Sequence, residues 1–513
     1  MTGLVSLVGA GPGDPGLLTL AGRDRLARAD VVVADYLVNP ALLVHCRRGC
    51  EVHQRDAGPR GGVALDQAQT NALLVAKARA GLRVVRLKGG DPCLFGRGGE
   101  EAQALVRAGV PFELVPGVPS PLAAPQYAGI PVTHRDHTPA VTFVSGWEAY
   151  DKAGLAVQWQ HLARSAGTLV LLMGVRNARD NTARLIEAGR DPDTPAAAIR
   201  WGTRGIQRTI VATLGTLAAQ MESAGLRAPA IVIVGDVVAL RQELSWFESR
   251  PLFGRRVVLT RALDGAAGLA GLLGERGADV VLLPCLEIAP PLDLAALDRA
   301  VRAIESKSGV IVSSVHGVAA FFDGLARVGL DLRALAGRAV VAIGSATARA
   351  CEARGIRPDL VPEQPSSEGL VAAMQARQWL DRAWLHVRAE AGRDVLRDAI
   401  TEAGGQYVLA IGYRAVRPTV SEAVLRSLRE PEAGGEGFDA VVLGSGLAGE
   451  HLLATLREAW GESDARAALA RAQLLAIGPV TAAALEALGL RVDAIAASPA
   501  EAAIADALQQ LPH

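Results

Sequence analysis

The sequence predicts an α/β protein whose sheets are mostly parallel. Short runs of β-branched residues alternate with alanine- and leucine-rich stretches of helical periodicity along the whole chain. Most of these runs end at glycine or at a small polar residue, as strands do before a turn. With 513 residues, half of them hydrophobic, the chain is long enough to build several cores.

In the first half, two glycine-rich turns follow predicted strands. Gly9–Pro15 follows the first strand, and Arg86–Glu101 overlaps the end of the third and continues beyond it. Glycine allows a backbone to approach a ligand closely at positive φ, so both turns predict a cleft at the carboxyl edge of a sheet. The glycine spacing does not fit a dinucleotide fingerprint, and Pro12 and Pro15 lack amides that a pyrophosphate needs. The strands predicted here are Val5–Val8, Val31–Ala34, Arg83–Leu87, Val141–Ser145, Thr168–Met173 and Ala230–Val234.

A charged stretch that ends in Pro251 interrupts the pattern, and we expect a domain boundary at about residue 250. The strands predicted beyond it are Val257–Thr260, Val280–Leu283, Val310–Ser313, Val340–Ile343, Trp384–Val387, Ala440–Leu443 and Leu474–Ile477. Two further extended segments, Glu287–Leu292 and Tyr413–Pro418, divide this half into a central block and two flanks. They predict a two-stranded hinge between two lobes with a cleft, unless Pro290 and Pro291 only end a strand in an ordinary loop.

Composition excludes some classes of function. The formal net charge is zero, which gives no reason to expect binding to nucleic acid or to a membrane surface. Only four of the 53 basic residues are lysines, which we attribute to composition bias. Five cysteines predict reduced thiols, and no leader or apolar run long enough for a membrane helix is evident, so we expect a cytoplasmic protein.

The first 240 residues resemble the uroporphyrinogen-III C-methyltransferases of the tetrapyrrole methylase family. The resemblance lies in Val8–Asp14, Ala29–Asp30, Asp35–Val38, Arg86–Glu101, Val115–Val118, Tyr127–Arg135, Thr168–Gly174 and Ala228–Val238. It implies two α/β lobes with S-adenosylmethionine bound between them, and methylation of uroporphyrinogen III at C2 and C7 to precorrin-2. The implied domain is 1–243, with lobes of about 1–116 and 117–243, followed by a linker at 244–252.

The same resemblance implies site residues. The implied cofactor contacts are Pro12, Gly89, Gly90, Asp91, Leu94, Pro119, Ser120, Met173 and Gly202. Asp35 and Arg97 match catalytic positions, and we expect Arg97 to bind a substrate carboxylate, because a guanidinium is a poor base at neutral pH. Glu100 and Glu101 begin a predicted helix, where we expect them to favour the helix dipole and be solvated. Pro119-Ser120-Pro121 departs from the family pattern and stiffens a loop beside the cofactor.

Residues 253–513 resemble uroporphyrinogen-III synthase. The resemblance is carried by Val258–Arg261, Val312–Val318, Ala342–Thr347, Ser366–Leu370, Val387–Arg388, Gly392–Arg393, Gly412–Arg414, Val442–Ser445 and Ala476–Thr481, and 246–254 resembles the joint of enzymes that fuse the two activities. It implies a two-lobed fold with a two-stranded hinge. Lobe one would be 253–286 plus 419–513, and lobe two 293–412.

Such synthases close hydroxymethylbilane into uroporphyrinogen III with inversion of ring D and loss of water. The reaction needs an acid, carboxylate anchors and a closed cleft. Tyr413 is the candidate acid, with a buried structural tyrosine as the alternative. The implied substrate-binding residues are Arg261, Ser313, Ser314, Thr347, Arg388, Ser445 and Thr481, with Arg393 as a further charge partner. Val480 replaces a threonine that is common in the family.

These observations predict a bifunctional enzyme of sirohaem or cobalamin synthesis, acting on small tetrapyrroles and forming a homodimer through its methyltransferase half. We expect no metal, because the spacing of His45, Cys46, Cys50 and His53 fits no common zinc motif. One alternative is that the first half methylates a later corrinoid precursor. Another is a methyltransferase fused to an inactive, synthase-like tetrapyrrole-binding module.

Overall fold

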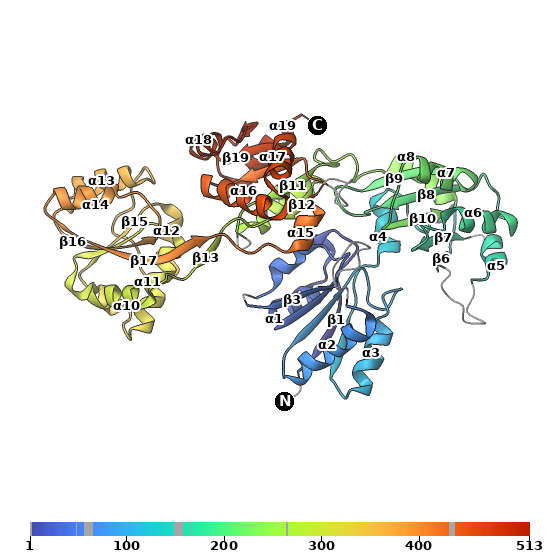
Figure 1. Ribbon diagram of the computed structural model, residues 1–513, viewed down its shortest axis with the longest axis horizontal. Coiled ribbons are helices and arrows are strands. Elements are labelled where there is room, and N and C mark those ends of the chain that lie inside the picture. Colours follow the sequence, from blue (N-terminus) through green and yellow to red (C-terminus); the bar gives the residue numbers. More distant parts are fainter. Residues whose placement is uncertain are drawn as a thin grey trace. The chain divides into compact units, whose positions relative to one another are not determined.

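The computed structural model describes residues 3–47, 49–55, 65–147, 157–165, 167–262, 265–429 and 437–512, which form four five-stranded sheets covered by helices (Figure 1). These residues divide into two units. The large unit comprises Met1–Pro284 and Val420–His513, and the small unit comprises Cys285–Thr419. The α/β class predicted from the sequence is confirmed.

The first sheet of the large unit has the strand order β3-β2-β4-β1-β5, and every neighbouring pair is parallel. Its inner strands are fully buried, because β-branched side chains fill both faces under the helices. The elements are β1 (Val5–Gly9), η1 (Pro15–Leu17), α1 (Leu20–Arg28), β2 (Val31–Asp35), η2 (Pro40–His45), β3 (Glu51–Arg55), α2 (Gln67–Arg79), β4 (Val84–Lys88), α3 (Gly98–Arg107) and β5 (Phe112–Val115).

The second sheet has the order β6-β7-β10-β8-β9 and is largely antiparallel, since β10 runs against both of its neighbours and β8 against β9. The prediction of mostly parallel strands is therefore wrong for this sheet, in which only β6 and β7 pair in parallel. The elements are α4 (Ser120–Tyr127), β6 (Val141–Ser145), α5 (Trp159–Arg164), β7 (Thr168–Leu172), α6 (Ala178–Glu187), β8 (Pro195–Arg200), β9 (Arg208–Thr213), α7 (Leu214–Ser223), β10 (Ala230–Val234), η3 (Asp236–Leu240) and α8 (Arg241–Leu244).

The third sheet, also in the large unit, is parallel and has the order β12-β11-β18-β19-β20. Its central neighbours β11 and β18 come from the two separate stretches of chain that build this unit. The elements are β11 (Arg256–Leu259), α9 (Ala267–Glu275), β12 (Asp279–Leu282), α15 (Glu422–Ser427), β18 (Ala440–Leu443), α16 (Gly446–Trp460), α17 (Glu462–Arg471), β19 (Gln473–Ala476), α18 (Pro479–Ala487), β20 (Ala494–Ile495) and α19 (Glu501–Gln510).

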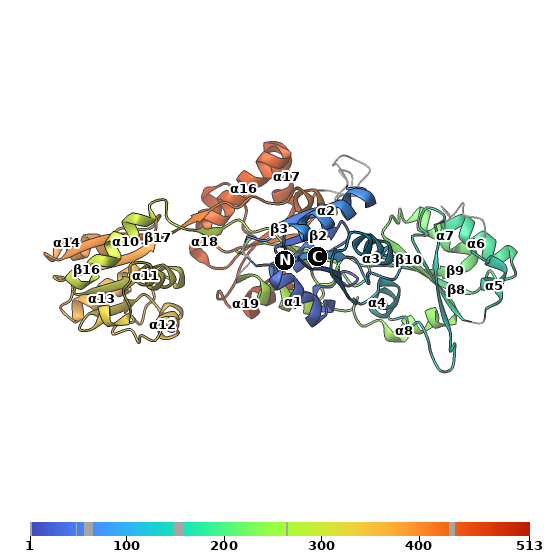
Figure 2. The same ribbon diagram turned by 90° about the horizontal axis from the view of Figure 1, so that it is seen from below.

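The small unit contains the fourth sheet, of order β13-β17-β16-β14-β15 (Figure 2). Hydrophobic clusters lie on both of its faces. The elements are β13 (Glu287–Ala289), α10 (Leu294–Arg302), η5 (Ala303–Ser306), β14 (Gly309–Val312), α11 (Val315–Arg327), η6 (Leu332–Leu335), β15 (Ala339–Ala342), α12 (Ser345–Glu352), α13 (Ser367–Ala376), β16 (Ala383–Ala389), α14 (Val395–Glu402) and β17 (Gln406–Val416).

The two extended segments predicted to form a hinge do pair with each other. Strand β13 runs antiparallel to the end of β17, and Ile288 faces Ala415. β17 begins at Gln406, earlier than expected, because its first part is a parallel neighbour of β16. Motion about this pair, and the domain limits 1–243, 244–252 and 253–513, stay predictions.

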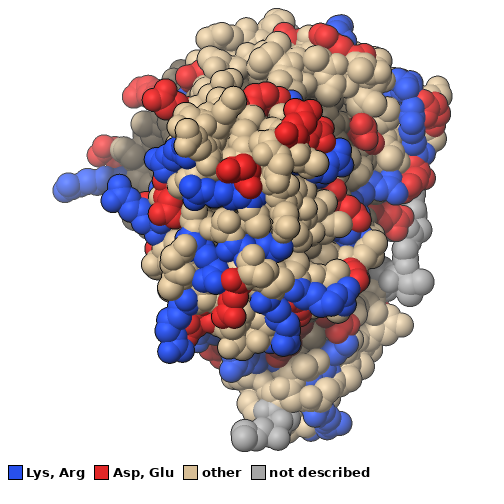
Figure 3. Space-filling view, turned by 90° about the vertical axis from the view of Figure 1, so that its left-hand side faces the viewer, with Lys and Arg blue, Asp and Glu red and all other residues tan. Residues whose placement is uncertain are grey.

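Charged side chains of both signs are interspersed on the face in Figure 3. In the small unit many arginines pair with nearby carboxylates, as Arg327 does with Asp298 and Arg354 with Asp323. The arginine-rich composition is thus matched locally by acidic residues rather than gathered into one basic surface. No helix in the described ranges is both long and apolar enough to cross a bilayer.

Candidate functional site

The two glycine-rich turns meet at the carboxyl edge of the first sheet. Gly11 and Gly90 exchange backbone hydrogen bonds of 3.2 and 2.7 Å, with Gly90 at φ +66°. Gly117, after β5, packs so closely that an added Cβ would lie 2.3 Å from the carbonyl oxygen of Gly90. An added Cβ on Gly9 would lie 2.5 Å from Gly117 Cα. Side chains are excluded at this contact, which leaves backbone groups on its surface.

Asp91 holds this arrangement together. One carboxylate oxygen accepts a hydrogen bond from the amide of Cys93 at 2.8 Å, and the other accepts from the amide of Gly117 at 3.1 Å. The carboxylate therefore ties the turn after β4 to the loop that leads to Pro119 and Ser120 at the start of α4. At this edge lie the predicted contact residues Pro12, Gly89, Gly90, Asp91, Leu94 and Pro119, on turns, and Ser120, the first residue of α4.

The second sheet contributes two more turns with unusual backbone. Met173 follows β7 with φ +58° and is 49% exposed. Gly202 follows β8, between Trp201 at φ +50° and Thr203 at φ +74°. β7 and β8 run in the same direction, since both are antiparallel to β10, so Met173 and Gly202 lie at one edge of their sheet.

The turn around Gly202 also contacts the first lobe. Thr203 Oγ1 accepts a hydrogen bond from the amide of Asp14 at 3.0 Å, and an added Cβ on Gly202 would lie 2.3 Å from Ala124 Cβ in α4. The structure thus brings the turn after β8 against both the first glycine-rich turn and α4. None of the contacts described for this chain joins Met173 to another predicted cofactor residue.

Asp35 is the last residue of β2, and its carboxylate pairs with Arg86 of β4. Arg97 is the residue before α3, at φ +59°, and its guanidinium makes two hydrogen bonds to Glu100, one of 3.0 Å. Glu100 is exposed, as predicted. Glu101 is fully buried, so its predicted solvation is wrong. The physical reason is that Glu101 lies on the apolar face of α3 and meets two buried cations.

Those cations, Arg86 and Lys88, are respectively 0% and 1% exposed. They form with Asp35 and Glu101 a buried charge cluster that the sequence reasoning missed. Burial lowers the pKa of Lys88, and the charge of Arg86 lowers it further. Burial also disfavours the charge of Arg86, but Asp35 and Glu101 outweigh that cost and raise its pKa. The sequence does contain a signal for this cluster, since Arg86 and Lys88 are cations at alternate positions of a strand that is otherwise apolar.

In the small unit, Tyr413 and Ser314 are in direct contact. The hydroxyl of Tyr413 donates to Ser314 Oγ at 2.8 Å, and the same oxygen accepts the amide of Gly317 at 3.0 Å. Ser314 is thus both the N-cap of α11 and the partner of the predicted acid. The ring of His316 lies 5.4 Å from that of Tyr413, a neighbour that sequence reasoning did not single out.

The remaining predicted residues of the small unit lie at the same sheet edge. Ser313 follows β14, and Thr347 is buried in the first turn of α12. Arg388 is 9% exposed in its side chain and donates to Asp394 at 2.9 Å, while Arg393 pairs with Glu368. Both arginines therefore already have carboxylate partners, which a substrate carboxylate would have to displace or share.

The large unit places Arg261, Ser445 and Thr481 after β11, β18 and β19, three adjacent parallel strands. Arg261 lies beside Gly444, since an added Cβ there would lie 3.9 Å from Arg261 Cγ. Ser445 caps α16 by accepting the amide of Ala448 at 3.2 Å. Thr481 is buried in the first turn of α18, and its neighbour Val480 is 85% exposed.

The same local structure recurs in both units. A strand ends, an extended glycine or serine follows, and a helix begins, as at Ser314, Gly344, Ser445 and Gly478. Helix N-termini present unpaired amides and a positive dipole end, and these bind carboxylates. The four turns therefore suit a ligand that carries several carboxylates.

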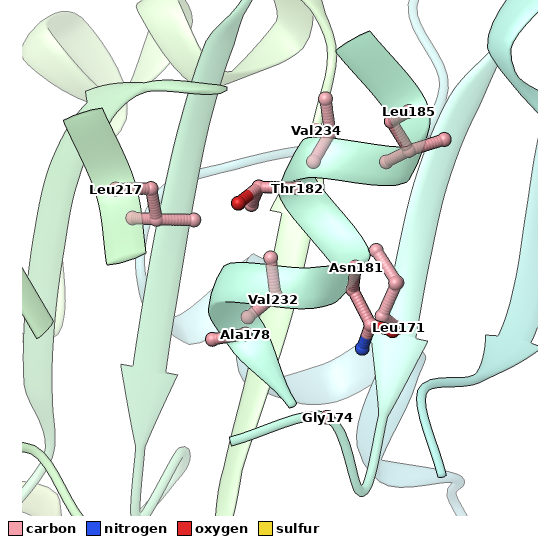
Figure 4. A pocket seen from close by; sticks show the side chains of 9 residues that line it. All are labelled: Leu171, Gly174, Ala178, Asn181, Thr182, Leu185, Leu217, Val232 and Val234. Carbon is pink, nitrogen blue, oxygen red and sulfur yellow. The ribbon is translucent and has the colours of Figure 1, made fainter. Parts of the chain in front are cut away.

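Figure 4 shows a cavity in the second lobe. It is lined by Leu171, Gly174, Ala178, Asn181, Thr182, Leu185, Leu217, Val232 and Val234. Most of these side chains belong to the hydrophobic core between α6, α7 and the sheet, and Asn181 donates to the Gly146 carbonyl at 3.0 Å. It is a packing feature of the core. In the part of the chain that is described, no group of three or more histidine, cysteine and acidic side chains could hold a metal ion.

Comparisons with known proteins assign both halves. Residues 4–218 match the family model "Tetrapyrrole (Corrin/Porphyrin) Methylases", and residues 267–506 match "Uroporphyrinogen-III synthase HemD". The chain is 40% identical to the porphyrin biosynthesis protein HemD of Ruminiclostridium josui over 362 residues, which are 70% of this chain and 71% of that protein. It is also 40% identical to the uroporphyrinogen-III C-methyltransferase of Bacillus subtilis over 366 residues, 71% of this chain and 74% of that protein.

Among solved structures, one similar chain is the uroporphyrin-III C-methyltransferase of Thermus thermophilus in complex with S-adenosylhomocysteine. It is 39% identical and covers 46% of this chain and 100% of its own, with a TM-score of 0.40. The two family models match consecutive stretches of the chain, and the two relatives cover 70% and 71% of it. The chain therefore belongs to the family of tetrapyrrole biosynthesis proteins in which a tetrapyrrole methylase is followed by a uroporphyrinogen-III synthase.

Proposed function

We propose that the second half closes hydroxymethylbilane to uroporphyrinogen III, with inversion of ring D, and that the first half methylates this product at C2 and C7 to precorrin-2. The observation that carries the proposal is the succession of the two family matches, each over a set of turns at the carboxyl edges of sheets. The uroporphyrinogen III made by the second half would be the substrate of the first half. The final product would serve sirohaem or cobalamin synthesis.

S-adenosylmethionine is the methyl donor in this proposal, and when bound it supplies an electrophilic methyl group. The contact of Gly9, Gly90 and Gly117 fits such a ligand, because a Cβ at Gly9 or Gly117 would clash with neighbouring backbone and Gly90 has a φ of +66° that suits glycine. Pro12, Gly89, Leu94, Ser120 and the other turn residues named above would hold it. Their task is positioning, which contributes more to methyl transfer than any single acid or base.

Arg97 would bind a carboxylate of the tetrapyrrole. Its side chain is 51% exposed beside the turn, its guanidinium stays charged at neutral pH, and it is already oriented by Glu100. Asp35 would face the reacting pyrrole from the end of β2. An anchored carboxylate keeps one pyrrole edge in place while the other residues fix the methyl donor.

In the synthase half, Tyr413 would assist departure of the hydroxyl group of hydroxymethylbilane. In the structure the phenolic proton of Tyr413 is donated to Ser314 Oγ, so acid catalysis requires this proton to rotate toward the leaving hydroxyl. Ser314 Oγ, which accepts the Gly317 amide, would then donate its own proton to the phenolic oxygen. The phenolic proton would then point away from Ser314 and be available to the leaving hydroxyl. The helix N-termini and Arg261 would hold the substrate carboxylates.

The test is anaerobic incubation of the full-length protein with hydroxymethylbilane, with and without S-adenosylmethionine, followed by chromatography and mass analysis of the tetrapyrroles. Formation of uroporphyrinogen III, converted to a dimethylated species when the donor is present, would support both activities. Only uroporphyrinogen I, from spontaneous closure, would reject the synthase activity. Val480, an exposed residue at a position where the resemblance to the synthases implies a threonine, would then favour a methyltransferase with a tetrapyrrole-binding module.

Dimerisation through the methyltransferase half and a cytoplasmic location are parts of the same proposal. Sedimentation of the full chain and of the chain with a charged residue at exposed Leu20 or Val106, which are 71% and 64% exposed, would test the dimer. A monomeric wild-type protein would remove that part of the proposal and leave the two reactions untouched.

A further inference from the structure

The buried charge cluster below Asp35 is the feature that the proposed reactions leave unexplained. Arg86 and Lys88 occupy alternate positions of β4 and therefore point to one face of the sheet, toward α2 and α3. Glu101 of α3 meets them with a single oxygen, which accepts from Arg86 Nε at 3.1 Å, Lys88 Nζ at 3.0 Å and Gln67 Nε2 at 3.0 Å. Its second oxygen has no hydrogen-bond partner.

One guanidinium connects three elements. Besides Glu101 of α3, Arg86 donates through Nη1 to the carbonyl of Val33 at 3.1 Å and through Nη2 to the carboxylate of Asp35. Val33 and Asp35 both lie on β2, so the guanidinium of Arg86 fixes the end of that strand. Asp35 is the member of the cluster that reaches the surface, with 23% of its side chain exposed.

Stability alone does not account for these charges. Apolar side chains of similar volume usually stabilise a core as well as buried ion pairs do, because burial of charge costs desolvation energy. A planar guanidinium, in contrast, restricts a carboxylate to one orientation through hydrogen bonds at fixed angles. The cluster therefore suits the purpose of orientation better than that of stabilisation.

We propose that Arg86 is a positioning residue for methyl transfer, which holds the Asp35 carboxylate in one orientation at the carboxyl edge of the first sheet. Glu101 and Lys88 hold Arg86 in turn. The inference rests on the proposed methylation of uroporphyrinogen III and adds a role for a residue that does not touch the substrate.

The test variant is Arg86→Lys, which keeps the positive charge but cannot contact Asp35, Glu101 and Val33 together. We expect kcat for methylation of uroporphyrinogen III to fall about 10- to 100-fold, since misplacement of a group by about 1 Å has effects of that size. The Kd of S-adenosylhomocysteine should stay the same, because the Arg86 side chain donates its hydrogen bonds to Glu101, to Asp35 and to the carbonyls of Val33 and Leu87, none of which belongs to the glycine contact. Arg25→Lys is the matched control: Arg25 makes a two-pronged pair with Glu113 in the same lobe, and its replacement should leave kcat unchanged.

A double-mutant cycle separates positioning from a structural role. In an Asp35→Asn background, Arg86→Lys should lower kcat less than about twofold further, because the group through which it acts is already altered. An equal loss in both backgrounds, or full activity of Arg86→Lys, would overturn the inference and leave the proposed methylation intact. A wild-type protein that does not methylate would overturn both.

A single variant covers the case in which Arg86→Lys does not fold, as shown by lost binding of S-adenosylhomocysteine. Asp35→Asn removes the charge that Arg86 orients, and we expect it to bind S-adenosylhomocysteine normally with kcat reduced at least about 10-fold. If Asp35→Asn methylates at the wild-type rate, the orientation of this carboxylate has no part in the reaction and the inference is wrong.

Discussion

Replacement of Asp279 by alanine tests whether the methylase and the first synthase sheet are joined as tightly as the structure indicates. Asp279 begins β12 and is 3% exposed. Arg204, from the turn after β8, donates to both of its oxygens at 2.9 and 2.8 Å, and Arg256 Nε lies 3.0 Å from Oδ2. The turn itself fits closely, since an added Cβ on Gly205 would lie 2.2 Å from the amide nitrogen of Asp279.

The size of the effect follows from what remains after the carboxylate is removed. Arg256 is 3% exposed and Arg204 15% exposed in its side chain, so two guanidinium groups would stay largely out of water without their counter-charge. Loss of one partner of a buried ion pair costs about 3–5 kcal/mol. For the large unit, which spans 1–284 and 420–513, that corresponds to a decrease of roughly 4–6 °C in the melting temperature.

Thermal unfolding of the full-length protein, followed by calorimetry, measures this decrease. Glu222→Ala is the matched control, because Glu222 also receives two hydrogen bonds from an arginine, Arg179, but both side chains are more than half exposed. A surface pair of this kind is screened by water, and the control should melt with the wild-type protein.

Two results would refute the reasoning. If Asp279→Ala and Glu222→Ala melt alike, the carboxylate of Asp279 is solvated and the junction is loose. If Arg204→Ala and Asp279→Ala add fully in the double variant, the two side chains do not interact, since neighbours in one ion pair should couple.

Three further predictions follow from single positions. Gly117→Ala should weaken binding of S-adenosylhomocysteine by more than about 10-fold in calorimetric titration, because its Cβ would lie 2.3 Å from Gly90 O; unchanged affinity would contradict the backbone cradle. Burial lowers the pKa of His386 to about 3, so the imidazole is neutral in the folded protein. The free energy of unfolding is therefore unaffected by titration of His386 above the ordinary pKa of 6.5, and it should decline by up to about 1.4 kcal/mol per pH unit as the pH falls from 6.5 toward 3. Hydrogen exchange of β16 against pH should show this slope, and His386→Gln should flatten it; an equally steep slope in the variant would show that other groups cause it. Tyr413→Phe should slow formation of uroporphyrinogen III by about 10²- to 10⁴-fold while methylation of added uroporphyrinogen III continues; a wild-type rate would exclude Tyr413 as the acid.

The sequence predicted strands best where they are buried on both faces. Val31–Asp35 and Ala440–Leu443 are dense in β-branched and aliphatic residues, as parallel central strands require. β8, with three consecutive alanines, and β3, with polar residues at alternate positions on a sheet edge, were missed. β8 becomes a strand through its pairing with β9 and β10, and β3 through its pairing with β2, and local propensity does not encode such pairing.

The sequence likewise predicted some parts of the candidate site and not others. Glycine content indicated the turns at Gly9 and Gly90, because a backbone that closely approaches another backbone or a ligand requires glycine, and glycines are visible in the sequence. The contact between Tyr413 and Ser314 joins residues 99 positions apart, and only the fold reveals it. Glu101 was misplaced because its position in the first turn of a helix suggests capping, whereas the apolar face of α3 carries it inward.

The third sheet also determines an order of events during synthesis of the chain. Its central strand β11 pairs with β18, and the amide of Arg256 bonds to Asp439, 183 residues further along. At usual rates of translation, β18 is synthesised on the order of ten seconds or more after β11 and β12. During this time the apolar edge of β11 that pairs with β18 has no partner. The small unit is made within this interval and can fold first. We therefore expect that a released chain ending shortly after residue 420 holds a finished methylase and a finished small unit, while its third sheet is incomplete and prone to aggregation.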